Sequence, residues 1–237
     1  MMIEDHWWWR PGWRPGRRMY TWHVTFGEMP CVGDLAAHVQ ARLAGLPGLD
    51  LVPGRWLHLT TQGVGFTDEV VSADVVAIVD AARRRLADVE PPQVTIGPAR
   101  VASEGVAFGV SPRDGLTVLR DGLRAAVAEI WSPARVPESD DWTPHVSVAY
   151  SRVSGPAGMY EAALAGEDAA VSVTIGSVQL IMLGRDRHVY EWDTQAEVRL
   201  APARPALRLP ARTPPTRIWV PRAPSDGGTG GIGRKPS

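Results

Sequence analysis

Hydrophobic and polar residues follow two periodicities along residues 19–200. Alternation with a period of two, in segments rich in β-branched and aromatic residues, predicts strands, and apolar residues spaced three or four apart predict helices. The alternating segments are 19–26, 51–61, 93–103, 105–110, 143–150, 171–183 and 188–200. The helical segments are 31–45, 69–88, 116–130 and 156–165. Short strands interspersed with helices favour the α+β class.

Turn residues divide this pattern further. Glu104-Gly105 predicts a hairpin between 93–103 and 105–110, and 184–187 predicts a second hairpin between 171–183 and 188–200. Pro53-Gly54 introduces a kink into the segment 51–61. The chain therefore contains two rounds, and in each a helix leads to a strand with a central histidine.

The two ends of the chain differ from this pattern. Residues 1–18 repeat the motif W-R-P-G, whose Pro-Gly turns predict an arm wrapped on the body of the protein. Its tryptophans and arginines are suited either to stacking on bases and contacting phosphates or to packing of the indoles against the core, and packing is the favoured interpretation. Residues 203–237 are rich in Pro, Arg and Gly without periodicity and predict a disordered tail. The organisation predicted is an arm (1–18), one domain (19–202) and a tail.

Composition is consistent with one sizeable core or two small lobes that share a cleft, since 44% of the 237 residues are hydrophobic. The net charge of -1 excludes a polycation that binds nucleic acid over its whole surface. The tail carries a charge of about +6, which would either steer a polyanion or simply keep the tail solvated; the second interpretation is favoured.

A single cysteine, Cys31, allows no intramolecular disulfide and no paired-cysteine metal site. No apolar run is long enough to span a bilayer, and the first residues are too polar for a signal peptide. The metal-binding pattern HExxH is also absent. We therefore expect a cytoplasmic protein that needs no metal or other cofactor and has no membrane partner.

Two triplets carry the candidate chemistry: His58-Leu59-Thr60 and His145-Val146-Ser147. Side chains at i and i+2 of a strand share a face, so each triplet presents an imidazole and a hydroxyl together. Two such strands facing one another across a cleft would supply an acid, a base and two hydroxyls around one phosphate, which is what metal-free phosphodiester cleavage requires. The spacing alone equally allows core histidines that bond backbone carbonyl groups.

Other residues are weaker candidates. His23, in the triplet His23-Val24-Thr25, could contact substrate or be an ordinary strand residue, and the second interpretation is favoured. Tyr150 is a possible substrate contact, although on a regular strand its odd spacing from His145 directs it to the opposite face. The remaining histidines, 6, 38 and 188, are expected at the surface or at helix caps.

The segments RWLHLTTQGVGF (55–66) and WTPHVSVAYS (142–151) resemble the two-histidine (2H) phosphoesterase superfamily, and more narrowly its bacterial 2′-5′ RNA ligase and cyclic phosphodiesterase branch. The resemblance covers roughly residues 19–200. It implies a bilobed fold in which two antiparallel sheets line a central cleft with helices outside. It also implies that His58 and His145 are the acid/base pair and that Thr60 and Ser147 bind phosphate, with Ser147 departing from the commoner Thr.

The function expected from these motifs is metal-independent cleavage of a 2′,3′-cyclic phosphate, or the making and breaking of a 2′-5′ phosphodiester in RNA. RNA ends or small nucleotides would be the substrates of a monomeric enzyme. Two alternatives stay open at this point. One is a non-catalytic protein that binds RNA ends on the same scaffold, and the other is a phosphodiesterase of small cyclic nucleotides.

Overall fold

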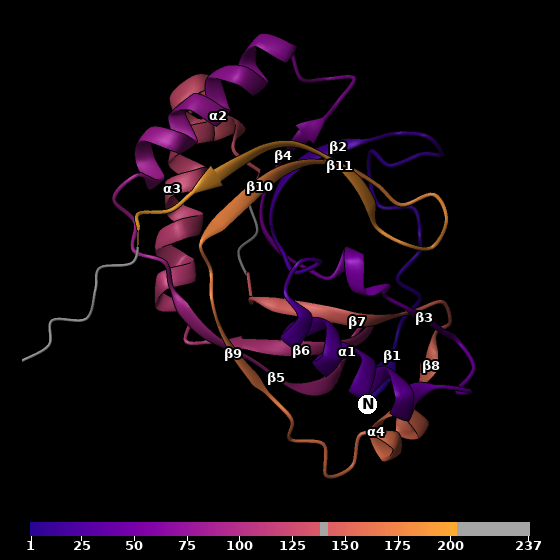
Figure 1. The fold of residues 1–237 in the computed structure, drawn as a ribbon. Helices are drawn as coiled ribbons and strands as arrows, with labels where there is room; N and C mark the ends of the chain where they lie inside the picture. Colours follow the sequence, from indigo (N-terminus) through magenta and orange to yellow (C-terminus); the bar gives the residue numbers. More distant parts are fainter. Residues whose placement is uncertain (138–141, 203–237) are drawn as a thin grey trace, which may run out of the picture. The chain divides into compact units, whose positions relative to one another are not determined.

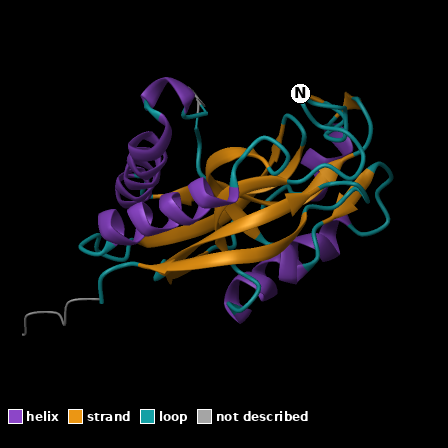
Figure 2. Ribbon diagram, turned by 90° about the horizontal axis from the view of Figure 1, so that it is seen from above, coloured by secondary structure: helices purple, strands orange, loops and turns teal. Residues whose placement is uncertain are grey.

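The computed structural model describes residues 1–137 and 142–202, and the predicted tail (203–237) lies outside this part. Its strands form a four-stranded sheet, a five-stranded sheet and a two-stranded ribbon, all with antiparallel neighbours (Figure 1). Figure 2 shows helices packed around these central strands. The predicted α+β class is therefore confirmed.

The four-stranded sheet has the order β11-β10-β2-β4. Its strands are β2 (Met19–Thr25), β4 (His58–Phe66), β10 (Ser177–Gly184) and β11 (Glu191–Arg199). The last two form the hairpin that the sequence predicts. β4, which carries the first His-x-Thr triplet, lies at one edge of this sheet.

The five-stranded sheet has the order β3-β7-β6-β5-β9. Its strands are β3 (Leu49–Leu51), β5 (Gln93–Ala102), β6 (Gly105–Ser111), β7 (His145–Ser151) and β9 (Val171–Thr174). β5 and β6 form the predicted hairpin. β7 carries the second triplet and contacts β4 of the other sheet.

Four α-helices and two short 3-10 turns complete the described residues. The α-helices are α1 (Pro30–Leu43), α2 (Ser72–Leu86), α3 (Asp114–Trp131) and α4 (Gly158–Ala163). The 3-10 turns are η1 (Gly54–Trp56) and η2 (Pro133–Arg135). No α-helix in this part of the chain is long and apolar enough to cross a membrane.

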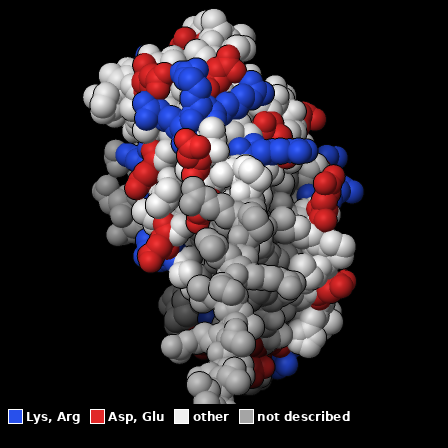
Figure 3. Space-filling model, turned by 60° about the vertical axis from the view of Figure 1, so that its left-hand side comes forward, with Lys and Arg blue, Asp and Glu red and all other residues white. Residues whose placement is uncertain are grey.

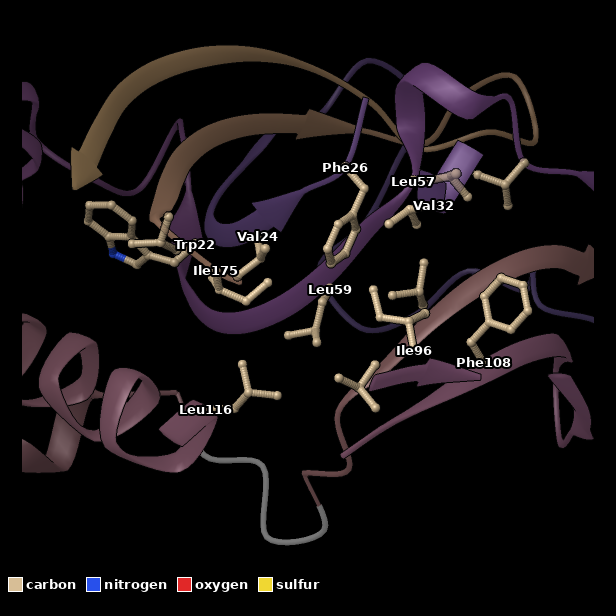
Figure 4. Packing of buried hydrophobic residues seen from close by; sticks show 14 of the residues in the cluster. Trp22, Val24, Phe26, Val32, Leu57, Leu59, Ile96, Phe108, Leu116 and Ile175 are labelled. Carbon is tan, nitrogen blue, oxygen red and sulfur yellow. The ribbon is translucent and has the colours of Figure 1, made fainter. Parts of the chain in front are cut away.

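One apolar core joins the two sheets and the helices. Figure 4 shows Val24 and Leu59 of the four-stranded sheet, Ile96 and Phe108 of the five-stranded sheet and Leu116 of α3 as members of one buried cluster. All five side chains are buried. Because Leu59 lies in this core, strand alternation directs its neighbours His58 and Thr60 to the opposite face of β4.

Two predicted strands are interrupted. The segment 171–183 is not one strand, because β9 pairs with β5 in one sheet and β10 pairs with β2 in the other. The chain crosses between the sheets at Ile175-Gly176, where the buried Ile175 side chain continues the apolar pattern. The segment 51–61 is also divided, because the 3-10 turn η1 follows Pro53 and separates β3 from β4.

The surface of α2 and α3 carries arginines that are paired with carboxylates. Arg84 and Arg85 of α2 both bind Glu129 of α3, and Arg83 binds Asp80. Figure 3 shows basic and acidic side chains interspersed on the face that it presents. These arginines therefore do not form an uncompensated basic patch.

The arm of residues 1–18 packs on the body of the protein, but the favoured interpretation of its tryptophans holds only in part. Met2–Ile3 form β1, which the sequence pattern did not predict, and pair with β8 (Gly155–Pro156). Ile3 and Trp7 are buried, whereas Trp8 and Trp9 are about half exposed. The arm therefore combines buried and exposed indoles.

Candidate active site

The two triplets face one cavity of about 350 Å³. His58 and His145 are the first residues of β4 and β7, and each is followed two residues later by its hydroxyl partner, Thr60 or Ser147. All six candidate residues of the sequence analysis line this cavity: His23, His58, Thr60, His145, Ser147 and Tyr150. The remaining lining residues are His6, Arg10, Trp13, Met19, Thr21, Gly63, Glu104, Leu183 and Tyr190.

Both histidines are oriented by the same kind of hydrogen bond. Nδ1 of His58 lies 2.8 Å from the carbonyl oxygen of Trp56, and Nδ1 of His145 lies 2.9 Å from that of Thr143. A carbonyl oxygen only accepts, so in each ring Nδ1 carries the hydrogen. A core histidine would also form such a bond to a backbone carbonyl. At the cavity, the bond fixes the tautomer and leaves Nε2 as the ring nitrogen available for proton transfer.

Each strand has a register shift directly after its triplet. Between β2 and β4, Trp22 pairs with Gln62 and His23 with Thr60, which leaves Thr61 as the extra residue. Between β6 and β7, Val106 pairs with Ala149 and Ala107 with Ser147, which leaves Val148. A bulge of this kind redirects the side chains that follow it.

The bulge at Val148 explains the position of Tyr150. Regular alternation from His145 would direct Tyr150 away from the cavity, but one extra residue returns it to the face that carries Ser147. Burial raises the pKa of Tyr150 far above its usual value, and the neighbouring Ser147 side chain acts in the opposite direction. Tyr150 therefore stays protonated at neutral pH.

His23 supports Thr60 in the corresponding way. Its Nε2 lies 3.2 Å from Oγ1 of Thr60, and its ring stacks on that of His58 with 4.4 Å between centroids and 3° between planes. Nδ1 of His23 is buried and has no partner among the described residues. Because orphaned buried N–H groups are rare, the hydrogen belongs on Nε2, which donates to Thr60. The Thr60 hydroxyl hydrogen is then free to donate to a ligand.

Burial makes the two stacked imidazoles weak bases. It lowers the pKa of His58 to about 4, against the opposing effect of the Trp56 carbonyl bond, and the nearby His145 and His6 lower it further. Burial also lowers the pKa of His23 well below its usual value. Both rings are therefore neutral at pH 7. His145, by contrast, is exposed at the cavity.

The wall of the cavity contains a second polar cluster, which the sequence analysis missed. His6 is only 7% exposed, so the expected surface position is wrong. Its Nδ1 lies 2.9 Å from Glu104 and its Nε2 lies 3.0 Å from the Tyr190 hydroxyl. The His6 ring also stacks on Tyr150, with 4.2 Å between centroids.

The charges of this cluster follow from its contacts. Burial lowers the pKa of His6, although the hydrogen bond to Glu104 opposes the shift. Burial acts to raise the pKa of Glu104, but the His6 hydrogen bond and the charge of Arg10 outweigh it and lower that pKa to about 2. Neutral His6 thus donates from Nδ1 to the Glu104 carboxylate and accepts from Tyr190 at Nε2.

Metal ligands are not clustered in the described part of the chain. It contains no group of three or more His, Cys, Asp or Glu side chains placed to hold a metal ion.

The α+β fold and the paired His-x-Thr and His-x-Ser strands around one cavity agree with the resemblance to the 2H phosphoesterase superfamily. The sequence model described as the 2′-5′ RNA ligase superfamily matches residues 31–187. The chain therefore belongs to the 2′-5′ RNA ligase superfamily.

Solved structures have a similar fold at low sequence identity. The protein TT0787 of Thermus thermophilus is 17% identical, with a TM-score of 0.60 over 77% of this chain and 97% of that one. Escherichia coli LigT in its apo form is 15% identical, with a TM-score of 0.58 over 78% of this chain and 99% of LigT. LigT complexed with 3′-AMP gives a TM-score of 0.57 at 15% identity, over 78% and 98% of the two chains. No curated protein matches the chain.

Proposed function

We propose that the protein is a metal-independent phosphoesterase that opens 2′,3′-cyclic phosphates at RNA ends, or makes and breaks 2′-5′ phosphodiester bonds, with His58 and His145 as its catalytic residues. The observation that carries the proposal is the shared geometry of the two imidazoles. Each is tied through Nδ1 to a backbone carbonyl and presents Nε2 beside a hydroxyl at one cavity.

The hydrolytic step balances with these two residues alone. A water molecule attacks phosphorus while its proton passes to Nε2 of His58. The bond from phosphorus to one ribose oxygen breaks, and Nε2–H of His145 donates the proton that this oxygen needs. The product is a phosphate monoester with a free neighbouring hydroxyl, and proton exchange with solvent restores both rings.

The environments of the two histidines support this division of roles. His58 is buried with a pKa of about 4, so it is neutral at pH 7 and able to accept a proton. His145 is exposed, so its protonated form keeps contact with water. Thr60 and Ser147 are placed to donate to the non-bridging oxygens as negative charge builds up in the transition state. His23 and Tyr150 act as positioning residues for these hydroxyls.

Turnover of a 2′,3′-cyclic mononucleotide by EDTA-treated protein tests the proposal. We expect EDTA to leave the rate unchanged, and His58→Ala or His145→Ala to lower kcat by about 10²–10⁴ with an unaltered far-UV circular dichroism spectrum. Loss of activity on EDTA treatment that zinc restores would contradict the mechanism. Salt-dependent binding of RNA ends that survives both replacements, without turnover by the wild type, would instead identify a non-catalytic binder.

A further inference from the structure

Residues 1–18 add a positively charged wall to the cavity. The family match begins at residue 31, so this arm lies outside it. Three arm residues, His6, Arg10 and Trp13, nevertheless line the same cavity as His58 and His145. Arg10 is also the one residue among those lining the cavity that carries a permanent positive charge.

The arm is fastened close to Arg10 by backbone hydrogen bonds. The Glu4 amide donates to the Ser103 carbonyl at 2.7 Å, and the His6 amide donates to the Ser151 carbonyl at 2.8 Å. Arg185 donates to the His6 carbonyl at 2.8 Å. The arm is therefore held against the folded domain by these hydrogen bonds.

Arg10 and Arg185 bring two positive charges to this region, and of the two only Arg10 lines the cavity. Arg185 is 4% exposed and forms no ion pair with a described carboxylate; its guanidinium lies over aromatic rings that include Trp13 and Tyr190. Arg10 pairs with Glu104, the one carboxylate among the described residues that line the cavity, whereas Arg185 lies outside the cavity lining. Arg185 donates to the carbonyl oxygens of His6 and Trp8, which are neutral, so an anion bound nearby would offset its buried positive charge.

One buried guanidinium nitrogen of each of these arginines also lacks a hydrogen-bond acceptor. Nε of Arg10 and Nη1 of Arg185 have no partner among the described residues. Buried polar groups are normally hydrogen-bonded. Each arginine therefore keeps a donor that no described residue satisfies.

We propose that Arg10, supported by Arg185, forms a second phosphate subsite beside the catalytic histidines. This inference rests on the proposed function and deepens it. The catalytic histidines act on the terminal phosphate, and Arg10 binds a further phosphate of the same substrate. The substrate is then a molecule with at least two phosphates, such as an RNA end with its next phosphodiester, and not a bare cyclic mononucleotide.

Equilibrium binding of reaction products tests this subsite without requiring turnover. Three ligands are compared by calorimetry: adenosine 2′-phosphate, a diadenylate ending in a 2′-phosphate, and adenosine 2′-phosphate carrying a 5′-pyrophosphate. We expect at least one ligand with additional phosphate to bind about tenfold or more tightly than adenosine 2′-phosphate. A gain for the diadenylate alone identifies an RNA chain, and a gain for the pyrophosphate alone identifies a small nucleotide.

Arginine replacements then locate the effect. Arg10→Gln should bind the ligands with additional phosphate about as tightly as adenosine 2′-phosphate. Arg10→Lys should retain part of the difference in affinity, because the charge is kept. Arg14→Gln is the matched control, because Arg14 belongs to the same arm but is 67% exposed and pairs with Asp68 away from the cavity lining. It should bind as the wild type does.

Equal affinity of the wild type for all three ligands, or an unchanged gain in Arg10→Gln, would overturn the subsite. Failure of the proposed function has a different signature. The ligands with additional phosphate would then still bind more tightly than adenosine 2′-phosphate, but the protein would turn over no cyclic phosphate.

Discussion

Acidification should destabilise the folded protein through His58. Burial lowers the pKa of His58 from 6.5 to about 4 in the folded state, whereas the unfolded chain keeps the ordinary value. Between these two values the unfolded state binds more protons than the folded state, so the free energy of unfolding falls as pH decreases. The stability that neutral His58 contributes is present above pH 6.5 and is lost toward pH 4.

The size of the effect follows from the shift. Each pKa unit corresponds to about 1.4 kcal/mol, so the full loss is about 3 kcal/mol, of which about 2 kcal/mol is already lost at pH 5. His58→Gln removes the titrating group, and its amide can still donate to the Trp56 carbonyl. Between pH 7.5 and pH 5, the free energy of unfolding of the variant should therefore fall by about 2 kcal/mol less than that of the wild type.

Urea unfolding at pH 7.5 and pH 5 measures this difference. Leu59→Ala is the control, because it removes a buried apolar side chain from the same strand without changing any titrating group. It should be less stable at both pH values but keep the wild-type pH dependence. An equal loss of stability in the wild type and in His58→Gln would refute the reasoning.

Three replacements around the cavity give further predictions. His23→Phe keeps a buried aromatic ring against His58 but removes the bond to Thr60, so kcat/KM for a cyclic phosphate should fall about tenfold; an unchanged value would exclude the positioning role. Tyr150→Phe removes the hydroxyl beside Ser147 and should lower kcat/KM by about three- to tenfold; an unchanged value would exclude a positioning role for Tyr150. Thr60→Val removes a transition-state donor and should lower kcat by about 10- to 100-fold with little change in KM; an effect confined to KM would indicate ground-state binding only.

The sequence predicts the features that depend on local periodicity. The hairpin of β5 and β6 and the His-x-Thr and His-x-Ser triplets are visible because strand alternation and turn residues are local signals. A bulge is not visible in the same way. One extra residue at Val148 turns Tyr150 toward the cavity, although the spacing from His145 predicts the opposite face.

Local periodicity cannot predict features that depend on contacts between distant segments of the chain. Ile175 continues the apolar pattern of its neighbours, so the crossing from one sheet to the other leaves no trace in the alternation. The cluster of His6, Glu104 and Tyr190 joins the arm, the turn between β5 and β6, and the loop before β11. His6 is expected at the surface from the sequence, and only the fold brings the three residues together.

The pH dependence of kcat/KM for a 2′,3′-cyclic mononucleotide tests most directly that buried, neutral His58 is the general base, since this parameter reports the titration of the free enzyme. We expect kcat/KM to change little between pH 6.5 and pH 5, because a base with a pKa of about 4 is still mostly neutral there. An ordinary histidine base with a pKa of about 6.5 would lose about 16-fold in rate between pH 6.5 and pH 5. A loss of that size, while circular dichroism shows the protein still folded, would contradict the account.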